Sequence, residues 1–336
     1  MAATNRGGRG LWLSMTLSNK HRPFRFGVLA EHSTTPTTFV DTARRAEAAG
    51  YAIVLIRDHF IEEPFGHQLA PFTALANAAA ATSTLRVGTL VLANDYRHPV
   101  VVAKETATLD GFSGGRVELG LGAGFSVPEY HQAGLPLDPG GTRIDRLAES
   151  LQVIKAVWAA EPCTFHGAHY TIDGLRGYPT PVQQSQPPLL VAGGGRRILS
   201  MAARAADIVG LLSAPIVNGL ITDDPRSRLP ERVDEKVGWI RAAAGERFDQ
   251  LELSIVASIS VTEDRKQAAA EVARQRRWQT VSPEQIVSMP SQLIGTHEEI
   301  VDALLERRER YAISYIVVSD ADLDTAAPIV ARLAGR

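Results

Sequence analysis

The histidine at position 59 is the side chain in this sequence best placed to exchange protons. His59 and its neighbour Asp58 follow a short apolar run, residues 53–56, that has the composition of a buried β-strand. Histidine gains and loses a proton near neutral pH without a large change of its pKa. Neighbouring side chains on an extended chain point to opposite sides, so we expect only one of the two to face a site. His59 is therefore a candidate acid–base residue, and the pattern alone leaves open which of the two side chains faces the site.

Three glycines come at the end of another buried run and directly after it. Gly120, Gly122 and Gly124 have G-x-G-x-G spacing, whereas dinucleotide-binding turns have G-x-G-x-x-G. Pro128 is also expected to interrupt the helix that would carry the pyrophosphate of a dinucleotide. The glycines therefore indicate that the backbone closely approaches either another chain segment or a flat ligand.

A glycine triplet, Gly193, Gly194 and Gly195, follows the apolar run 188–192 and precedes a helical pattern that begins with Arg196 and Arg197. The unpaired N–H groups at a helix start and the positive end of the helix dipole attract anions. We expect the triplet to bind a phosphate group and the two arginines to meet further negative charge.

Two other patterns match known sites less well. Residues 111–115 read G-F-S-G-G, which fits the G-x-S-x-G nucleophile motif, but a helical pattern precedes them and a strand pattern follows. That order is the reverse of a nucleophile elbow. His59, Glu62, Glu63 and His67 lie close in sequence without the spacing of a zinc site. We expect neither a serine hydrolase nor a metal enzyme.

The elements that must position these residues alternate regularly along the chain. Eight strand-like runs are separated by eight segments with apolar residues at helical spacing. The runs are residues 24–29, 51–56, 85–92, 116–121, 188–192, 207–212, 251–261 and 313–319. The helical segments are residues 37–49, 72–82, 100–110, 143–159, 198–205, 233–243, 264–276 and 297–310. This alternation predicts an α/β fold, a (β/α)8 TIM barrel with insertion loops at residues 161–187 and 213–232, and leaves two doubly wound halves as the alternative.

Composition and charge argue against a nucleic-acid-binding, membrane-spanning or disulfide-bonded protein. The chain has 336 residues, 45% of them hydrophobic, and its 35 basic and 37 acidic side chains give a net charge of −2. Such a balance offers no basic surface for nucleic acid or anionic lipid, and no apolar run is long enough for a membrane helix. The single cysteine, Cys163, excludes an internal disulfide. We expect a cytoplasmic protein with a flexible extension at residues 1–23 and one barrel domain at residues 24–336.

The sequence resembles the bacterial luciferase-like family of flavin- and deazaflavin-dependent oxidoreductases. The most specific match is residues 107–124, A-T-L-D-G-F-S-G-G-R-V-E-L-G-L-G-A-G. Shorter matches agree in order along the chain: Asp58-His59, G-T-L-V at 88–91, His98-Pro99, residues 143–149, P-T-P-V at 179–182, Gly193 to Gly195, and I-G-T at 294–296 with Glu298-Glu299. The resemblance covers residue 24 to about residue 318.

The resemblance implies a barrel that holds an isoalloxazine-like ring across its C-terminal mouth. A cis peptide between Leu90 and Val91 would support the face of the ring. His59 would exchange a proton near its reactive carbon, and Asp58 would help to anchor the cofactor. The loop beside the ring would be Gly122, Ala123, Gly124, Phe125 and Ser126, and Gly193, Gly194 and Gly195, with Arg196 and Arg197, would bind the phosphate and the anionic tail.

The resemblance also implies a reaction. Where the sugar-phosphate dehydrogenases of this family carry a glutamate, this chain has Phe125 and Ser126. We therefore expect an enzyme that uses coenzyme F420 to reduce an activated C=C or C=N bond of a small-molecule or peptide substrate, for instance a natural-product intermediate. We also expect it to form a homodimer. The alternatives are an FMN-dependent monooxygenase of a two-component system and a ligand-binding barrel without catalytic activity.

Overall fold

Eight parallel strands close into a barrel in the computed structural model, which describes residues 22–159 and 161–336. The barrel strands are β1 (Arg25–Leu29), β2 (Ile53–Ile56), β3 (Arg86–Thr89), β5 (Val117–Gly122), β8 (Leu189–Gly193), β9 (Ile208–Leu211), β12 (Glu252–Val256) and β15 (Ile313–Ser319). Each strand pairs in parallel with the next, and β15 pairs with β1. The predicted TIM barrel is confirmed, and the alternative of two doubly wound halves is wrong.

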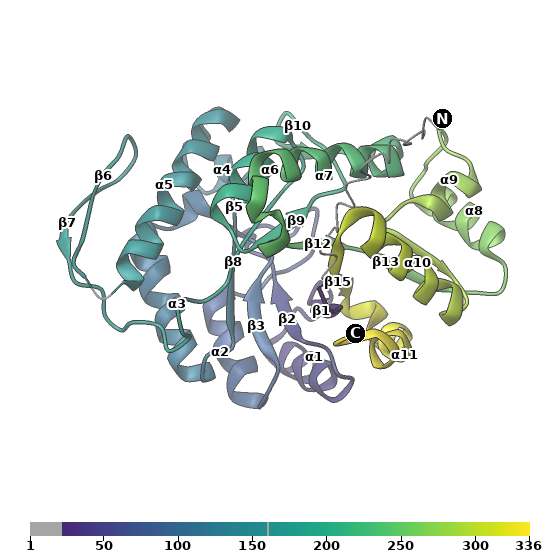
Figure 1. Cartoon of the computed structure of the whole chain (residues 1–336), viewed down its shortest axis with the longest axis horizontal. Helices are drawn as coiled ribbons and strands as arrows, with labels where there is room; N and C mark the ends of the chain where they lie inside the picture. Colours follow the sequence, from purple (N-terminus) through teal and green to yellow (C-terminus); the bar gives the residue numbers. More distant parts are fainter. Residues whose placement is uncertain (1–21, 160) are drawn as a thin grey trace, which may run out of the picture.

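Helices surround the barrel, as Figure 1 shows. Eight of them are α1 (Pro36–Ala48), α2 (Pro71–Ala81), α3 (Pro99–Ser113), α5 (Gly140–Trp158), α6 (Arg196–Ala205), α7 (Pro230–Ala244), α8 (Arg265–Gln275) and α10 (His297–Tyr311). Each corresponds to one of the predicted helical segments. Proline occupies the first turn of α1, α2, α3 and α7, where a helix loses no hydrogen bond to it.

The barrel interior has an apolar layer and a charged layer. Ile53, Leu55, Leu190 and Tyr315 are among the buried side chains of the apolar layer. At the amino-terminal ends of the strands, Arg25 pairs with Glu118 at 2.5 Å and with Glu252 at 2.7 Å, and Arg86 pairs with Glu118 at 2.7 Å. We call Arg25, Arg86, Glu118 and Glu252 the barrel-floor cluster.

Two predicted strands are each divided into two elements. The run 85–92 ends as β3 at Thr89 and resumes as β4 (Leu92–Ala93), with a cis peptide between Leu90 and Val91 in the gap. The run 251–261 divides into β12 and β13 (Ser258–Val261), because β13 leaves the barrel and pairs with β14 (Gln292–Gly295). A strand that changes its partner keeps its apolar composition, so the pattern gave no sign of the break.

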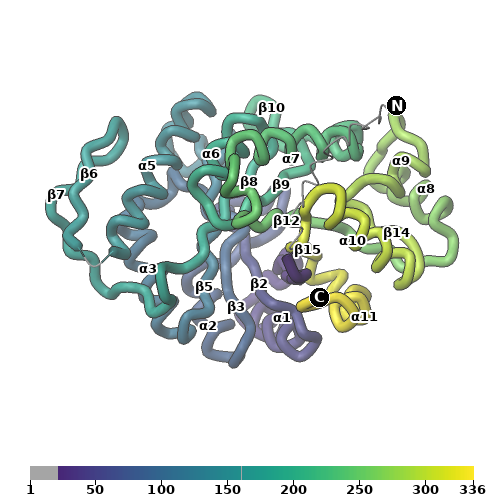
Figure 2. Tube along the Cα trace, viewed as in Figure 1, coloured from purple at the N-terminus to yellow at the C-terminus, as the bar shows by residue number. Residues whose placement is uncertain are grey.

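The remaining elements are the insertions, the short helices and turns, and the helix that follows β15; Figure 2 shows the hairpin of the 161–187 insertion standing away from the barrel. These elements are β6 (Cys163–His166) and β7 (Thr171–Leu175), β10 (Ile216–Val217) and β11 (Leu220–Ile221), α4 (Val127–Gln132), α9 (Pro283–Ser288), α11 (Leu323–Leu333), and the 3-10 turns η1 (Asn94–Tyr96), η2 (Pro225–Arg228), η3 (Gly245–Gln250) and η4 (Asp320–Asp322). Cys163, on β6, is buried, and burial raises the pKa of its thiol.

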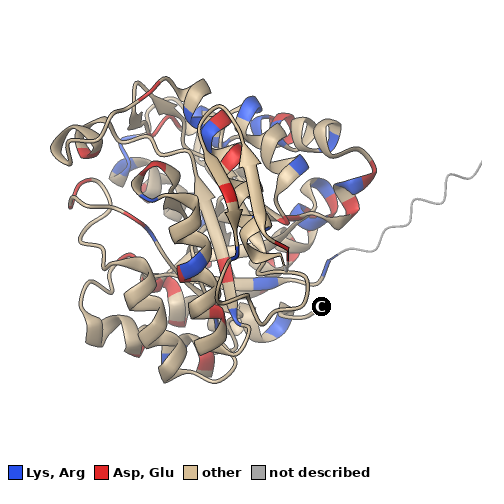
Figure 3. Cartoon of the chain, turned by 90° about the vertical axis from the view of Figure 1, so that its left-hand side faces the viewer, with Lys and Arg blue, Asp and Glu red and all other residues tan. Residues whose placement is uncertain are grey.

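Basic and acidic positions, coloured blue and red in Figure 3, are intermixed over the helices. Within residues 22–159 and 161–336, no helix is both long and apolar enough to cross a membrane. Of the predicted extension, residues 1–21 lie outside the described part of the chain. Arg22 donates a hydrogen bond to the backbone oxygen of Gln250.

Candidate functional site

The predicted site residues lie at or just beyond the carboxyl ends of β2, β3, β5 and β8. These strand ends form one face of the barrel, the face on which TIM barrels carry their active sites. His59 and Asp58 follow β2, Leu90 and Val91 follow β3, the Gly122 to Ser126 loop follows β5, and the glycine triplet begins at the last residue of β8. The fold therefore brings all of the predicted segments to one end of the molecule.

His59 is held by a buried carboxylate that the sequence analysis did not identify. Its Nδ1 lies 2.9 Å from Oε2 of Glu129, whose side chain is 1% exposed. Glu129 also accepts a hydrogen bond from the backbone N–H of Phe60. With Nδ1–H donating to this carboxylate, Nε2 is the ring nitrogen left to exchange a proton. His59 and Glu129 therefore have the geometry of an acid–base dyad at this face.

Aromatic rings enclose this dyad. The His59 ring lies 4.6 Å from the Phe65 ring and 6.0 Å from the Phe125 ring, measured between centroids. Tyr96 donates a hydrogen bond to Glu129, and burial together with that carboxylate raises the pKa of Tyr96. The Tyr96 hydroxyl is therefore a neutral donor to the Glu129 carboxylate and does not compensate its negative charge. The surroundings of His59 are largely apolar, and its side chain is only 13% exposed.

Asp58 is engaged by protein groups. Its carboxylate is 3% exposed and forms two hydrogen bonds with the Arg97 guanidinium, at 2.6 and 3.0 Å. It also accepts the backbone N–H of Ala93 at 3.1 Å. These bonds fix the chain that follows the Leu90–Val91 peptide. Asp58 thus positions residues 93–97, the segment that follows the peptide expected to support the ring.

The cis peptide predicted from the resemblance is confirmed, and two glycines explain how it fits. A Cβ atom on Gly120 would collide with the backbone oxygen of Thr89, and one on Gly122 would come within 2.7 Å of Val91 Cγ2. The close approach at these two positions is therefore to another chain segment. Leu90 and Val91 are half-buried and pack against the apolar layer of the barrel. They form an apolar platform at the barrel mouth.

The loop after β5 is fixed by an arginine and a tyrosine. Gly124 has a φ of +68°, and its Cα lies so close to the hydroxyl of Tyr130 that no side chain fits there. Arg143, on α5, donates to the backbone oxygens of Ala123 and Gly124. Ala123, Gly124 and Phe125 are half-buried, whereas Ser126 is buried at the start of α4.

The prediction that Pro128 interrupts a helix is wrong. Pro128 lies in the first turn of α4, where its missing N–H costs no hydrogen bond. This short helix carries Glu129 and Tyr130 inward. The predicted helix-to-strand order around the G-x-S-x-G sequence is confirmed, because Ser113 ends α3 and Gly114, with a φ of +64°, turns the chain toward β5.

The glycine triplet joins β8 to α6, as predicted. A Cβ on Gly193 would collide with the Ile198 side chain, and one on Gly194 would lie 3.2 Å from the Leu212 oxygen, whereas one on Gly195 would meet nothing within 4 Å. Gly195 is the N-cap of α6, and no side chain caps the first N–H groups of that helix. The open space and free donors at this helix start are suited to an anion.

The two arginines of this helix start differ. Arg197 pairs with both carboxylate oxygens of Asp145, at 2.7 and 2.8 Å. Arg196 is exposed and has no ion-pair partner within the described ranges 22–159 and 161–336. Of the two, Arg196 is the cation available to a bound anion.

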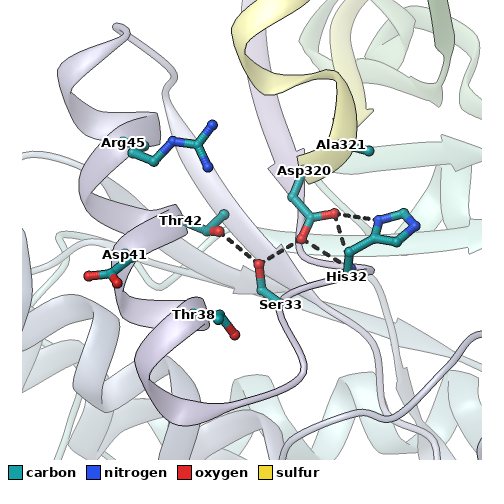
Figure 4. Close-up of a pocket in the computed structure, with 8 residues that line it drawn as sticks. All are labelled: His32, Ser33, Thr38, Asp41, Thr42, Arg45, Asp320 and Ala321. Atoms are coloured by element: carbon teal, nitrogen blue, oxygen red, sulfur yellow. Dashed lines mark hydrogen bonds and ion pairs between the residues drawn. The ribbon is translucent and has the colours of Figure 1, made fainter.

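A surface pocket of 260 Å³ lies beside this face, between the β1–α1 loop and η4. Figure 4 shows Asp320 in it, with Ser33 and His32 turned toward its carboxylate, at 2.6 Å to Ser33 Oγ and 2.9 Å to His32 Nδ1. Burial opposes the charge on Asp320, but its hydrogen bonds with Ser33 and His32 outweigh this and lower its pKa. Protein groups thus satisfy the Asp320 carboxylate, and neither His59 nor Glu129 lines this pocket.

Comparisons with known proteins agree with this geometry. The family model described as luciferase-like monooxygenase matches residues 22–314. An F420-dependent glucose-6-phosphate dehydrogenase of Nakamurella multipartita is 31% identical over 310 residues, which cover 89% of this chain and 85% of that protein. An F420-dependent hydroxymycolic acid dehydrogenase of Mycobacterium tuberculosis is 36% identical over 54% of this chain and 51% of that protein.

A solved structure shows the same fold. The coenzyme F420-dependent tetrahydromethanopterin reductase of Methanopyrus kandleri superimposes with a TM-score of 0.72 and 19% identity, over 94% of this chain and 98% of that one. Three observations indicate the same family: the motif block, the cis peptide between Leu90 and Val91, and the family match over residues 22–314. The chain belongs to the luciferase-like monooxygenase family of enzymes, and its curated relatives include F420-dependent oxidoreductases.

Proposed function

We propose that this protein is an F420-dependent oxidoreductase in which His59 exchanges the proton that accompanies hydride transfer. The observation that carries the proposal is the His59–Glu129 dyad, buried at the barrel mouth beside the apolar platform of Leu90 and Val91. The names of the two curated relatives support F420 as the cofactor. A deazaflavin supplies or accepts hydride but does not form the oxygen adduct that monooxygenation needs.

The residues present fit such a cofactor. Leu90 and Val91 would lie against the flat ring, and the backbone from Ala123 to Phe125 would lie at its edge. The open N-cap at Gly195 leaves room for a phosphate, with backbone N–H groups as donors and Arg196 as the cation. Ser126, buried at the start of α4, and Arg197, paired with Asp145, would act on the cofactor only through the chain around them.

The acid–base step follows from the dyad. The Glu129 carboxylate stabilises His59 when the imidazole carries two protons, so Nε2–H can be donated to the substrate and then replaced from solvent. For an activated C=C or C=N bond, hydride adds to the electron-poor carbon and this proton completes the neighbouring carbon or nitrogen. That reduction, which requires one proton donor, is the reaction we propose for this chain.

Oxidation of a secondary alcohol is the second candidate, and one observation favours it. With Nδ1–H donating to Glu129, the neutral His59 has a free lone pair on Nε2 that would take the proton of a hydroxyl group. The hydroxymycolic acid dehydrogenase among the relatives has a name that implies alcohol oxidation. Sugar-phosphate oxidation has less support, since Phe125 brings an apolar ring beside His59.

The test is a comparison of cofactors followed by an assay in both directions. The purified protein is titrated with F420 and with FMN, and we expect F420 to bind more tightly. Reduced F420 is then offered with enones and cyclic imines, and oxidised F420 with secondary alcohols, while the absorbance of the oxidised cofactor is followed. Tighter binding of FMN would contradict the proposal, and turnover of alcohols alone would select the second candidate.

A further inference from the structure

The insertion between β9 and α7 carries a hairpin whose exposed side chains, apart from Asn218 at its turn, are apolar. Ile216 is 42% exposed, Val217 49% and Leu220 54%, and Val127, which the hairpin touches, is 42% exposed. We call these four residues the hairpin patch. Residues 215–222 include no charged side chain. Exposed β-edges usually carry charges that prevent association, so an uncharged apolar hairpin marks a surface that another molecule covers.

The tip of this hairpin contacts the end of the Gly122–Ser126 loop and the first residue of α4. Asn218 and Gly219 turn the chain with φ values of +50° and +75°, as a two-residue hairpin turn requires. The Gly219 oxygen accepts the backbone N–H of Val127 at 3.3 Å, and a Cβ on Gly219 would lie 2.8 Å from the Phe125 oxygen. The ring of Phe125 in turn packs against His59. One residue thus separates the hairpin from the dyad.

The base of the hairpin is held in place by charged groups. The Asp223 carboxylate pairs with Arg228 at 2.7 Å and with Arg276 at 3.3 Å, and it accepts the indole N–H of Trp278 at 3.0 Å. On the other side, the Lys236 ammonium donates to the Leu212 oxygen at 2.7 Å. Both connections of the insertion to the barrel are therefore fixed, and the hairpin presents its apolar residues at a defined place.

Three occupants could cover such a surface, and the structure favours one. A stable dimer buries roughly 800 Å² on each partner, which is far more than a hairpin patch of four side chains provides. A membrane contact would need free cations beside the patch, but Arg226 and Arg228 are paired with Asp224 and Asp223. Contact with the loop that holds Phe125 leaves the substrate as the occupant.

We infer that the hairpin patch binds an apolar group of the substrate, a hydrocarbon chain or ring, while the reacting carbon lies near His59. This inference rests on the proposed function and specifies the substrate class for that site. The patch adds affinity in proportion to the apolar surface that it covers, so substrates that differ only in chain length should be distinguished by it.

The experiment measures binding of two ketones, 2-butanone and 2-undecanone, to the full chain saturated with oxidised F420, by calorimetry. In the wild-type protein, 2-undecanone should bind at least about tenfold more tightly, because each buried methylene contributes roughly fourfold in affinity. In the variant Val217→Ser/Leu220→Ser this ratio should fall to about threefold or less. Equal affinities in the wild-type protein, or an unchanged ratio in the variant, would overturn the inference.

Two control variants make the result specific. Val217→Ile/Leu220→Met keeps the hairpin apolar and should keep the ratio, and loss of the ratio in it would contradict a role for apolar contact. Phe112→Ser removes an exposed aromatic ring at the opposite end of the barrel and should leave both affinities unchanged. The ratio does not depend on turnover, so an inactive protein that still prefers 2-undecanone would contradict the proposed function alone.

Discussion

At the scale of single residues, His59 and Glu129 are expected to act as one unit. Replacing His59 by alanine removes the proton donor, so turnover should fall by about 10²–10⁴-fold, the usual contribution of general acid–base catalysis. F420 affinity should change little, because the glycine triplet and the Leu90–Val91 platform lie on other strands. Turnover, cofactor affinity and melting temperature are measured on the same protein. Near-wild-type turnover at saturating F420 would remove His59 from the chemistry.

The role of Glu129 is to position and stabilise His59, and a double variant tests it. In Glu129→Gln, a neutral hydrogen bond replaces a charge-assisted one, and kcat should fall about tenfold with KM nearly unchanged. The double variant His59→Ala/Glu129→Gln should be no slower than His59→Ala, because the carboxylate has no other path to the substrate. Additive losses in kcat would show that Glu129 acts on the reaction independently of His59.

At the scale of elements, the start of α6 is where a small change should affect cofactor binding without affecting the fold. Gly195 has an ordinary φ of −100° and open space around its missing Cβ. Gly195→Val should therefore lower the melting temperature only slightly, because valine is a poorer N-cap than glycine, while raising the Kd for F420 about tenfold or more by filling the space where the phosphate would bind. Gly238→Ala, at an equally open position on α7, is the control. Unchanged affinity in Gly195→Val would make the triplet a structural loop.

A second element-scale prediction concerns pH. The Glu47 carboxylate, on α1, accepts the backbone N–H groups of Ser83, Thr84 and Leu85 at 2.6–3.0 Å, and these bonds lower its pKa to about 2. A depressed carboxylate pKa stabilises the fold above the ordinary value of 4.5, and this contribution is lost as the pH falls toward 2. Glu47→Gln should lower the melting temperature at pH 7 and narrow its difference from the wild type by pH 3. A constant difference across this range would contradict the assignment.

The elements were largely predictable, and the contacts among them were not. Strands such as β2 are buried on both faces, so they read as continuous apolar runs, and the helices between them have a clear period. The helix α4 is only six residues long and has Pro128 in its first turn, so the sequence pattern did not predict it. Glu129 meets His59 across 70 residues, and Arg97 meets Asp58 across 39. Spacing in the sequence carries no information about such contacts until the loops have been folded.

At the scale of the whole molecule, the two ends of the barrel have different roles: the amino-terminal end stabilises the fold, and the carboxyl-terminal end carries the candidate site. The barrel-floor cluster lies at the amino-terminal ends of the strands, where TIM barrels keep their stabilising contacts. Glu118→Gln would leave Arg25 and Arg86 without their shared carboxylate, and we expect the free energy of unfolding to fall by about 3 kcal/mol. Urea denaturation measures the loss. Arg45→Gln breaks the exposed pair with Asp324 and should cost about 1 kcal/mol or less.

The same separation predicts the effect on activity. Substitutions in the barrel-floor cluster should leave kcat and the affinity for F420 unchanged at temperatures where the variant is folded. A fall in kcat in folded Glu118→Gln would show that the two ends are coupled through the apolar layer.

The burial of Cys163 has a practical consequence for observing the hairpin. The chain contains one cysteine, and its buried thiol, with a raised pKa, offers thiol-reactive reagents very little thiolate. A cysteine introduced at the exposed position 217, as Val217→Cys, would therefore be the site that takes up a fluorescent label. Emission from that label, sensitive to the polarity around it, would report when the hairpin becomes covered, in real time and in a single labelled species.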